Sequence, residues 1–403
     1  MNYSADEVIQ YIREADVKFI RLAFCDVFGR QKNIAVMPGE VRRAFEYGIS
    51  VDASAIAGFG GEVKSDLLLH PDASTLMGLP WRPESGKVVR MFCDVTHPDG
   101  TPFEGDTRAL LRRTAEDAKK RGVTFNFGSE MEFYLFKTDE NGARTLVPHD
   151  NAGYMDIAPE DKGENVRREI CLTLEKMGIQ PESSHHEEGP GQNEIDFRYS
   201  DALTAADNAV TFSAVVRTIA ARSGLYADFS PKPLIEGPGS GMHVNFSVGG
   251  PSGEGRLLSA AAGIMDKISE MTLFLNPTRA SYLRLGGSKA PGYVSWSREN
   301  RSQLIRIPAA SYSHERAELR SPDPTANPYI VFTLLIRAGL LGIEKGLVPP
   351  ESVDINLYTA AQEVLERLER LPDSMEKAKA ALLGGAFVRE CLPDAVIRAY
   401  LAL

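Results

Sequence analysis

Apolar and polar residues alternate in several short stretches of this 403-residue chain, most clearly in FNFGSEMEFYLF at 125–136. Successive side chains of a strand point to opposite faces, so Glu130 and Glu132 share one face while the apolar residues beside them share the other. The alternation therefore predicts a strand with one oily and one charged face. Two carboxylates this close repel each other unless water or a cation separates them. Taken alone, the stretch fits a solvated strand face as well as a buried site.

The same division into an apolar and a polar face recurs in HHEEGPGQNEIDFRYS at 185–200, GSGMHVNFSV at 239–248 and HERAELRSPDP at 314–324. In the first of these, the turn GPGQ separates Glu187 from the strand. The predicted polar faces carry Glu194, Asp196 and Arg198, then His243, Asn245 and Ser247, then Arg316, Glu318 and Arg320. A curved sheet that buries the apolar faces under helices would bring all the polar faces to one cavity.

Other segments predict the elements around these strands. The chain begins with a capped amphipathic helix, in which Ser4 and Glu7 have capping-box spacing, and continues with a hairpin formed by VKFIRLAFCDVF and KNIAVM. After the strand GKVVRMFCDV, the turn-rich HPDGTPFEGD is typical of a linker, and TRALLRRTAEDAKKRG predicts a long helix. Helices and short strands then alternate, so we predict an α+β fold with domains at 1–100 and 101–403.

Composition narrows the classes of partner. With 45 basic and 55 acidic residues, the chain has a formal charge of -10, which disfavours nucleic acid or an anionic membrane as a partner. The four cysteines form no CxxC pair, so we expect neither a disulfide framework nor a thiolate zinc site, and we predict a reducing, cytoplasmic location. The most apolar stretch, YIVFTLLIRAGLLGI, contains Arg337 and is too short to span a membrane.

The predicted cavity would hold several glutamates and a single histidine, which cannot all stay ionised together unless cations neutralise the carboxylates. Such ligands, with no thiolate, favour Mg²⁺ or Mn²⁺ over zinc and permit two or more ions. The arginines of the same region then look like anion clamps; they are Arg284, Arg301, Arg306, Arg316 and Arg320. Together these groups suit phosphoryl transfer from ATP. A lone strand glutamate or arginine is usually a surface residue, so the prediction depends on the whole set.

A family resemblance covers nearly the whole chain. The segments that carry it are VDASAIAGF, SDLLLHPD, FGSEMEF, HHEEGPGQNEI, SPKP, GSGMH, NPTRASYLRL, YVSWSRENRS, LIRIP and AELRSPDPTANPYI. In this order and spacing they are similar to the glutamine synthetase family, ATP-dependent ligases that join ammonia to the side-chain carboxylate of glutamate. The resemblance implies a small N-terminal β-grasp domain and a larger catalytic domain with a curved antiparallel sheet flanked by helices. It also implies a homo-oligomer, a dodecamer of two hexameric rings, with active sites between neighbouring subunits.

The resemblance also implies roles for individual residues. Glu132, Glu187 and Glu194 match the ligands of one metal ion, and Glu130, His243 and Glu318 match those of another. Motifs near the nucleotide and its phosphates contain Glu182, Lys232, Ser247, Arg301, Arg306 and Arg316. Arg284, Arg320 and the backbone of Gly239 match contacts to the amino-acid substrate, and Asp52 and Tyr154 match the amine site. The implied catalytic set is Asp52, Tyr154, Arg301 and Arg320. An acyl phosphate would form and an amine would displace its phosphate.

The chain departs from the family pattern where the substrates bind. A family DGSS motif reads DASA, with Ala55 in place of a hydroxyl; the flap LGGSKAP has Lys289 where a glutamate is expected; and Pro238 replaces an asparagine. These changes predict poor use of ammonium, unless Lys289 points away or Glu299 or Asp156 supplies the charge. Another amine or acid, a non-catalytic paralogue that binds nucleotide and metal, and a phosphotransferase remain open as alternatives.

Overall fold

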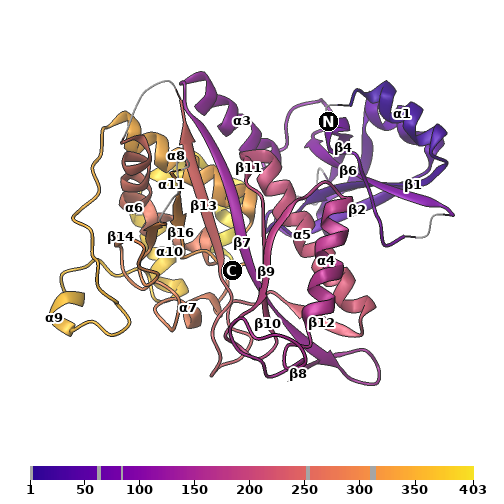
Figure 1. Ribbon diagram of the computed structural model, residues 1–403. Helices are drawn as coiled ribbons and strands as arrows, with labels where there is room; N and C mark the ends of the chain where they lie inside the picture. The colour runs from indigo at the N-terminus through magenta and orange to yellow at the C-terminus, as the bar shows by residue number, and fades with distance from the viewer. Residues whose placement is uncertain (1–2, 61–64, 83–84, 251–254, 309–314) are drawn as a thin grey trace.

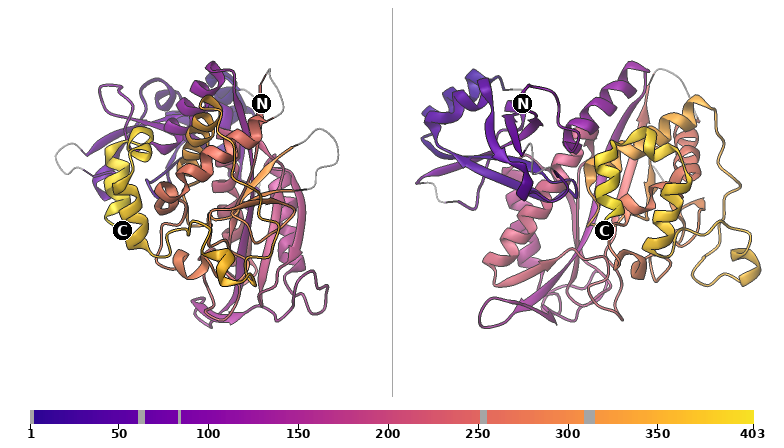
Figure 2. Two further views of the ribbon diagram at one scale, coloured as in Figure 1. Left: turned by 90° about the vertical axis from the view of Figure 1, so that its left-hand side faces the viewer. Right: turned by 180° about the vertical axis from the view of Figure 1, so that it is seen from behind.

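The computed structural model describes residues 3–60, 65–82, 85–250, 255–308 and 315–403. A small N-terminal domain lies beside a larger domain in which helices flank a curled sheet (Figures 1 and 2). The predicted α+β class is confirmed. The connection between the two parts runs from β6 (Lys87–Thr96) to α3 (Thr107–Lys120), the region predicted as a linker.

The small domain is built on a mixed sheet with the strand order β2-β1-β6-β4-β3, in which β1 and β6 are parallel. Its other strands are β1 (Val17–Cys25), β2 (Gln31–Val36), β3 (Ile49–Asp52), β4 (Asp66–Pro71) and β5 (Met77–Gly78). Its helices are α1 (Ala5–Glu14), α2 (Val41–Tyr47) and the 3-10 turns η1 (Pro38–Glu40), η2 (Ala53–Ala55) and η3 (Ala73–Thr75). The predicted capping box is present, since Ser4 and Glu7 satisfy each other's backbone N–H groups at the start of α1.

The sheet of the large domain has the order β14-β15-β16-β13-β7-β10-β9, and β8, β11 and β12 also pair with β7. Its strands are β7 (Thr124–Thr138), β8 (Arg144–Pro148), β9 (Pro181–His186), β10 (Gln192–Phe197), β11 (Ser200–Asp201), β12 (Leu225–Asp228), β13 (Met242–Gly249), β14 (Trp296–Arg298), β15 (Ile305–Ile307) and β16 (Ala317–Leu319). All pairs are antiparallel except β14 with β15. The long β7 is thus the strand around which the sheet is organised.

Helices cover the apolar face of this sheet. The helices that contact it are α3, α4 (Glu164–Lys176), α5 (Ala202–Arg222), α6 (Arg256–Leu275) and α8 (Pro328–Glu344). Of the remaining helices, α10 (Met375–Gly384) and α11 (Phe387–Cys391) pack on α6, and α9 (Gln362–Leu365) lies away from the sheet (Figure 1). The large domain also contains α7 (Ser281–Arg284) and α12 (Asp394–Leu401). Phe127 of β7 stacks on Phe332 of α8, with 4.4 Å between ring centroids. Met131, Phe133 and Leu135 are buried in the same core. Because these residues alternate with Glu130 and Glu132, burial of their face of β7 places the two glutamates on the opposite face of the strand.

No helix within the described ranges combines the length and apolar character needed to cross a bilayer. The apolar stretch that contains Arg337 instead forms the buried helix α8.

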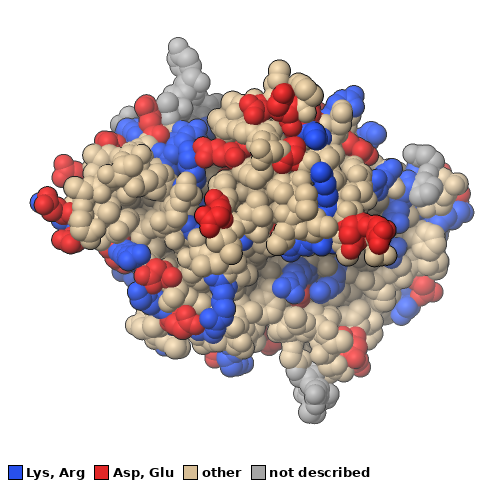
Figure 3. Space-filling model, turned by 90° about the horizontal axis from the view of Figure 1, so that it is seen from below, with Lys and Arg blue, Asp and Glu red and all other residues tan. Residues whose placement is uncertain are grey.

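Acidic and basic side chains are interspersed over the face of the molecule seen from below (Figure 3). This face is hollowed near its centre, and basic side chains gather in the hollow (Figure 3).

Candidate active site

The first predicted group of metal ligands lies on three neighbouring strands. β7, β13 and β16 carry Glu130, His243 and Glu318, and the pairing of β13 with β7 places His243 opposite Glu130. His243 Nδ1 lies 3.5 Å from Glu130 Oε2 and 3.6 Å from Glu318 Oε1. One potential ligand atom from each residue lies within 4.8 Å of the others. Strand register therefore assembles this group.

The second predicted group continues along the same face. The pairing of β10 with β7 places Glu194 opposite Glu132, and Glu187 lies in the turn between β9 and β10. Potential ligand atoms of Glu132 and Glu194 cluster with His243, and those of Glu187 and Glu194 cluster with His185. Glu194 thus links the two clusters. The six predicted ligands form one continuous series, which we call the glutamate line; its members are Glu187, Glu194, Glu132, His243, Glu130 and Glu318.

Burial and mutual repulsion destabilise the ionised glutamate line in the absence of a cation. Burial, followed by the charge of Glu187, raises the pKa of Glu132 to about 7. Burial and the charge of Glu132 raise the pKa of Glu194 well above its usual range. Burial, and then the charge of Arg320, lowers the pKa of His243, which leaves its imidazole neutral and able to bind a metal ion. The residues present therefore fit Mg²⁺ or Mn²⁺, which accept carboxylate oxygens and a single imidazole.

Neutral donors hold the glutamate line in place. Gln192 Nε2 and the backbone N–H of Gly241 both donate to Glu132 Oε2, at 3.3 and 2.8 Å. Asn245 Nδ2 donates to Glu130 Oε1 at 2.7 Å. Sequence reasoning gave no role to Gln192 or to Asn245. The signal available in the sequence was that each amide lies two residues from a predicted ligand, Glu194 or His243. Hydrogen bonds from neighbouring side chains commonly orient metal ligands.

Arginines converge on the Glu318 end of the line. Arg306 Nη1 lies 2.9 Å from Glu318 Oε2, and Arg320 Nη1 donates to Glu318 Oε1. Arg316 Nε donates at 3.0 Å to the side-chain oxygen of the β13 asparagine. The prediction of one strand that holds Arg316, Glu318 and Arg320 is wrong in extent, because β16 has only three residues and both arginines lie just outside it. The backbone pairs with β13 over residues 317–319 and with β15 over residues 318–319.

Arg284 lies next to the backbone of Arg320 and beside Gly239. The buried Arg284 guanidinium donates to the backbone oxygens of Ser321 at 2.8 Å and of Arg320 at 3.1 Å. A Cβ at Gly239 would lie 2.7 Å from Arg284 Cγ and 2.6 Å from the backbone oxygen of Pro231. A larger residue would therefore displace Arg284. The structure thus brings together two residues that the resemblance assigned to the amino-acid substrate.

The flap residue Lys289 meets the turn that follows Glu187. Lys289 Nζ lies 2.8 Å from Glu188 Oε1, and the backbone N–H of Glu188 donates to Glu187 Oε2 at 3.1 Å. The positive charge of Lys289 therefore lies against a carboxylate of the neighbouring turn, and poor use of ammonium stays a prediction. Sequence reasoning missed Glu188, since nothing in the chain order indicates that the turn and the flap are adjacent.

Tyr154 lies at the same turn. Its exposed ring packs edge-on against His185, with 5.5 Å between ring centroids. Burial of part of the ring and the charge of Glu187 raise the pKa of Tyr154, while Arg301 and Lys289 oppose the rise. Tyr154 and the flap therefore border the Glu187 end of the glutamate line. Arg301 is exposed, and its backbone oxygen accepts a hydrogen bond from the hydroxyl of Tyr358 at 3.3 Å.

Other predicted residues lie apart from the line. Asp52 is exposed on the small domain, where its Oδ1 accepts from the N–H and hydroxyl of Ser54 at 2.9 and 2.7 Å. Lys232 Nζ donates to the backbone oxygen of Gly237 at 2.5 Å. Within the described part of the chain, neither Glu182 nor Ser247 makes a side-chain hydrogen bond or ion pair with the glutamate line. Their nucleotide roles therefore stay predictions.

Comparison with known proteins agrees with this geometry. Residues 16–98 match the family described as "Glutamine synthetase, beta-Grasp domain", and residues 104–403 match "Glutamine synthetase, catalytic domain". A glutamine synthetase of Clostridium saccharobutylicum is 44% identical, over 99% of this chain and 94% of that protein. A glutamine synthetase of Methanosarcina mazei is also 44% identical, over 98% and 92%.

The solved structures that resemble this chain have the same architecture. One is described as "GmaS/ADP complex-Conformation 1"; it has a TM-score of 0.88 and 27% identity and covers 100% of this chain and 95% of its own. Another, "Apo GmaS without ligand", has a TM-score of 0.87 and 28% identity, with 98% and 94% covered. The predicted β-grasp domain and curved catalytic sheet are confirmed.

Fold and site together define an ATP-dependent carbon–nitrogen ligase. The chain belongs to the glutamine synthetase family. Members of this family depend on ATP and use divalent metals, and the glutamate line offers the acidic donors that such metals require.

Proposed function

We propose that this ligase activates the side-chain carboxylate of glutamate, or of a similar acid, and joins it to ammonia or another amine. The observation that carries the proposal is the glutamate line, in which buried carboxylates repel one another and a neutral imidazole lies among them. We assign Glu132, Glu187 and Glu194 to one metal ion and Glu130, His243 and Glu318 to a second. Bound divalent ions would neutralise charge on the phosphates of ATP.

The chemistry proceeds in two steps. A carboxylate oxygen of the acid attacks the γ-phosphorus of ATP and ADP leaves, which forms an acyl phosphate. The amine nitrogen then attacks the acyl carbon, phosphate departs with the oxygen that attacked, and the nitrogen passes its extra proton to the carboxylate that we assign to the amine site, Asp52. We assign the exposed Arg301 to the phosphate, and Arg320 lies at the Glu318 end of the line. Fixed positive groups stabilise charge that develops on the transferring phosphoryl group.

For the nucleotide, we assign contacts to Glu182, Lys232, Ser247, Arg306 and Arg316. The support is their motifs and, for the two arginines, their position at the Glu318 end of the line. The related structure described as a GmaS/ADP complex, at 27% identity over the whole chain, supports a nucleotide site on this fold. We assign the carboxylates of the acid to Arg284 and Arg320, with the backbone of Gly239 beside them.

Glutamate and ammonia are the default substrates, because curated relatives named glutamine synthetase are 44% identical over almost the whole chain. A related ligase that uses another amine is the second candidate. Ala55 and Pro238 favour it, as does a flap whose Lys289 pairs with Glu188 instead of presenting a carboxylate. The buried, mutually repelling ligands argue against a non-catalytic paralogue, since binding nucleotide alone does not require them.

We also propose a ring-shaped homo-oligomer, a dodecamer of two hexameric rings. Asp52 is exposed on the small domain, where its carboxylate accepts hydrogen bonds from the nearby Ser54. Its proposed place beside the amine, with Tyr154, then requires that a neighbouring subunit provide the cavity. We infer that each active site lies between two subunits.

The experiment that tests the proposed function measures ATP turnover and amide formation across a panel of carboxylic acids, with and without ammonium or alternative amines. We expect ADP, phosphate and amide in equal amounts, with glutamate among the best acids. Turnover that makes a stable phosphorylated product without any amine would instead support a phosphotransferase. An absence of turnover with every acid and amine would support the non-catalytic alternative.

A further inference from the structure

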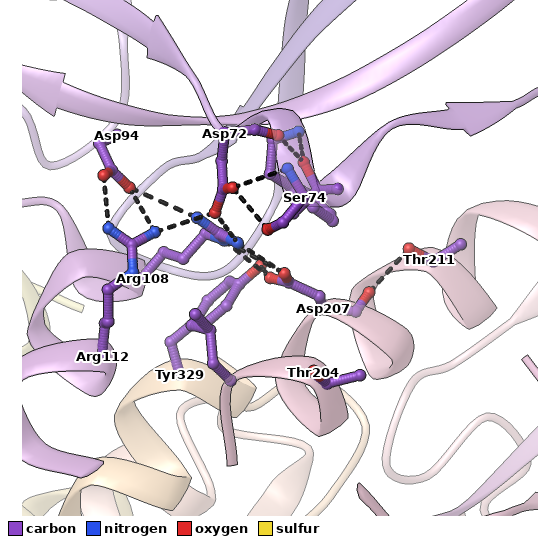
Figure 4. A network of polar contacts seen from close by, with 12 residues as sticks. Asp72, Ser74, Asp94, Arg108, Arg112, Thr204, Asp207, Thr211 and Tyr329 are labelled. Carbon is purple, nitrogen blue, oxygen red and sulfur yellow. Dashed lines mark hydrogen bonds and ion pairs between the residues drawn. The ribbon is translucent and has the colours of Figure 1, made fainter. Parts of the chain in front are cut away.

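A buried arginine joins the two domains. Arg108 of α3 is only 4% exposed, and its guanidinium contacts carboxylates from both sides of the seam (Figure 4). Its Nη2 lies 3.0 Å from Asp72 Oδ2 and its Nη1 lies 3.4 Å from Asp94 Oδ1, both in the small domain. On the other side, Nη2 lies 2.8 Å and Nε 2.9 Å from the carboxylate of Asp207 in α5. One side chain thus connects three carboxylates.

Further side chains complete this network. Arg112, one turn later in α3, donates to Asp94 Oδ1 at 2.8 Å and to Asp72 Oδ2 at 3.2 Å. Tyr329 of α8 donates to Asp207 Oδ1 at 2.7 Å. Partial burial alone would raise the pKa of Asp72, but hydrogen bonds from Ser74 and the charge of Arg108 lower it overall. The seam network, by which we mean Asp72, Ser74, Asp94, Arg108, Arg112, Asp207 and Tyr329, therefore favours the ionised pairs.

The small-domain members of the network lie on the sheet that carries Asp52. Asp72 directly follows β4 and Asp94 lies in β6, and these two strands are paired. β4 also pairs with β3, where Asp52 ends the strand opposite Asp66. Hydrogen-bonded strands move together. Contacts that fix the orientation of this sheet at Asp72 and Asp94 should therefore also fix the position of Asp52.

The large-domain members are connected to the glutamate line. α3 leads directly into β7, which carries Glu130 and Glu132, and α5 packs against the same strand. The seam network therefore lies between two sheets, one with the predicted amine-site aspartate and the other with the predicted metal ligands. None of its members belongs to the catalytic set assigned above.

We propose that Arg108 is a positioning residue that fixes the small domain so that Asp52 reaches the amine site of a neighbouring subunit. The inference rests on the proposed function and on the shared active site. Replacement of Arg108 should not affect acyl-phosphate formation, because the groups assigned to that step lie in the large domain. Its loss should instead leave the acyl phosphate without a well-placed amine. Water would then attack the acyl carbon and release the original acid and phosphate, so ATP would be consumed without amide.

The test compares two substitutions in the seam network with a control substitution that removes another ion pair of α3. Arg108→Gln removes the central cation, and Asp72→Asn weakens the link to the small domain while the contact between Arg108 and Asp207 stays. Arg337→Gln is the control, because Arg337 of α8 pairs with Asp117 of α3 at 2.8 Å within the large domain. Amide formed per ADP, the KM for the amine and the KM for ATP are measured for each variant. Light scattering checks that each assembly matches that of the wild type.

In both seam variants we expect amide per ADP to fall and the KM for the amine to rise, by about tenfold or more, as small misplacements of reacting groups typically cause. The KM for ATP should change little, and Arg337→Gln should resemble the wild type. Amide hydrogen exchange gives an activity-independent readout, in which residues 66–72 should exchange faster in the seam variants while residues 124–138 do not.

Unchanged amide yield and unchanged exchange in Asp72→Asn and Arg108→Gln would overturn the positioning role. Equal changes in both KM values, shared by Arg337→Gln, would also overturn it, because they would indicate a general loss of stability. Failure of the proposed function looks different: the wild type itself would then form no amide, whatever the exchange data show.

Discussion

Glu132 illustrates how much of the site is decided by single side chains. It accepts hydrogen bonds from Gln192 and from the backbone of Gly241, yet burial and Glu187 still raise its pKa to about 7. Neutral donors orient the carboxylate but do not cancel its charge. A divalent cation would supply the missing positive charge, so metal binding should depend strongly on the two β7 glutamates.

We expect Glu130→Gln and Glu132→Gln each to weaken Mn²⁺ binding by at least about tenfold to a hundredfold, the cost that loss of a group hydrogen-bonded to a metal ligand already carries. Glutamine keeps the shape of the side chain but removes its charge. Calorimetric titration of Mn²⁺ measures the effect directly, and Glu140→Gln, in the exposed turn after β7, serves as the control. Metal titrations that are identical for all three variants and the wild type would refute the assignment.

The same titration should depend on pH. Because the pKa of Glu132 in the metal-free protein is raised to about 7, a proton occupies this carboxylate at lower pH and a metal ion must displace it. Affinity should therefore be weaker at pH 6 than at pH 8, and binding should release protons. An affinity that is independent of pH over this range would show that the buried carboxylates are not ligands.

Residue-level prediction from sequence was strong for the glutamate line and weak at its edges. Alternation along 125–136 correctly placed Glu130 and Glu132 on one face, because the period of a strand is fixed by its backbone. The contact of Lys289 with Glu188 was not predictable in this way. It joins a flap and a turn whose proximity arises only from tertiary folding.

At the scale of elements, the flap and the turn between β9 and β10 meet at the Glu187 end of the glutamate line. The side chains of Lys289 and Glu188 are 56% and 41% exposed, so their ion pair contributes only about 0–1 kcal/mol to stability. A contact of this strength can break and re-form during turnover. We therefore expect it to affect closure over the acyl phosphate more than folding.

Glu188→Lys should lower the efficiency of amide formation by about fivefold, since two like charges about 4 Å apart in water repel by about 1 kcal/mol. The repulsion would hold the flap away and also disfavour a cationic amine. Lys289→Glu combined with Glu188→Lys restores opposite charges and should recover most of the loss. Steady-state kinetics in ammonium and in alternative amines measures both effects, with the exposed Glu160→Lys as a control.

No recovery in the charge-swapped double variant would contradict a closing role for the pair.

The length of β16 shows what a sequence pattern does not determine about an element. The alternation through Arg316, Glu318 and Arg320 suggested a longer strand than β16, because a sequence pattern does not reveal how far the partner strands extend.

For the whole molecule, the small domain carries an exposed Asp52 and the large domain carries the glutamate line. A single chain therefore holds two parts of a site that we propose to be completed between neighbours. Sequence pattern gave the α+β class and the resemblance gave the two-domain plan, since local periodicity and long motifs are visible in one chain. Such patterns do not reveal how subunits are arranged, so the prediction of a ring-shaped oligomer rests on the resemblance.

Complementation tests the shared site. Asp52→Asn and Glu132→Gln should each be nearly inactive in amide formation, because each removes one part of every site. Rings reassembled from a mixture of the two variants should regain activity, since some sites then combine Glu132 of one subunit with Asp52 of another. Light scattering should show a large oligomer throughout. A fully active monomer, or mixed rings without any recovery, would contradict the shared site.

The central claim is that a carboxylate is activated as an acyl phosphate before an amine displaces the phosphate. Glutamate labelled with ¹⁸O in its side-chain carboxylate, incubated with ATP, Mg²⁺ and ammonium, tests it most directly when the phosphate product is analysed by mass spectrometry. If a carboxylate oxygen attacks the γ-phosphorus and leaves with it, each phosphate formed must carry one ¹⁸O atom, in step with each amide. Amide formation accompanied by phosphate without ¹⁸O would contradict the account.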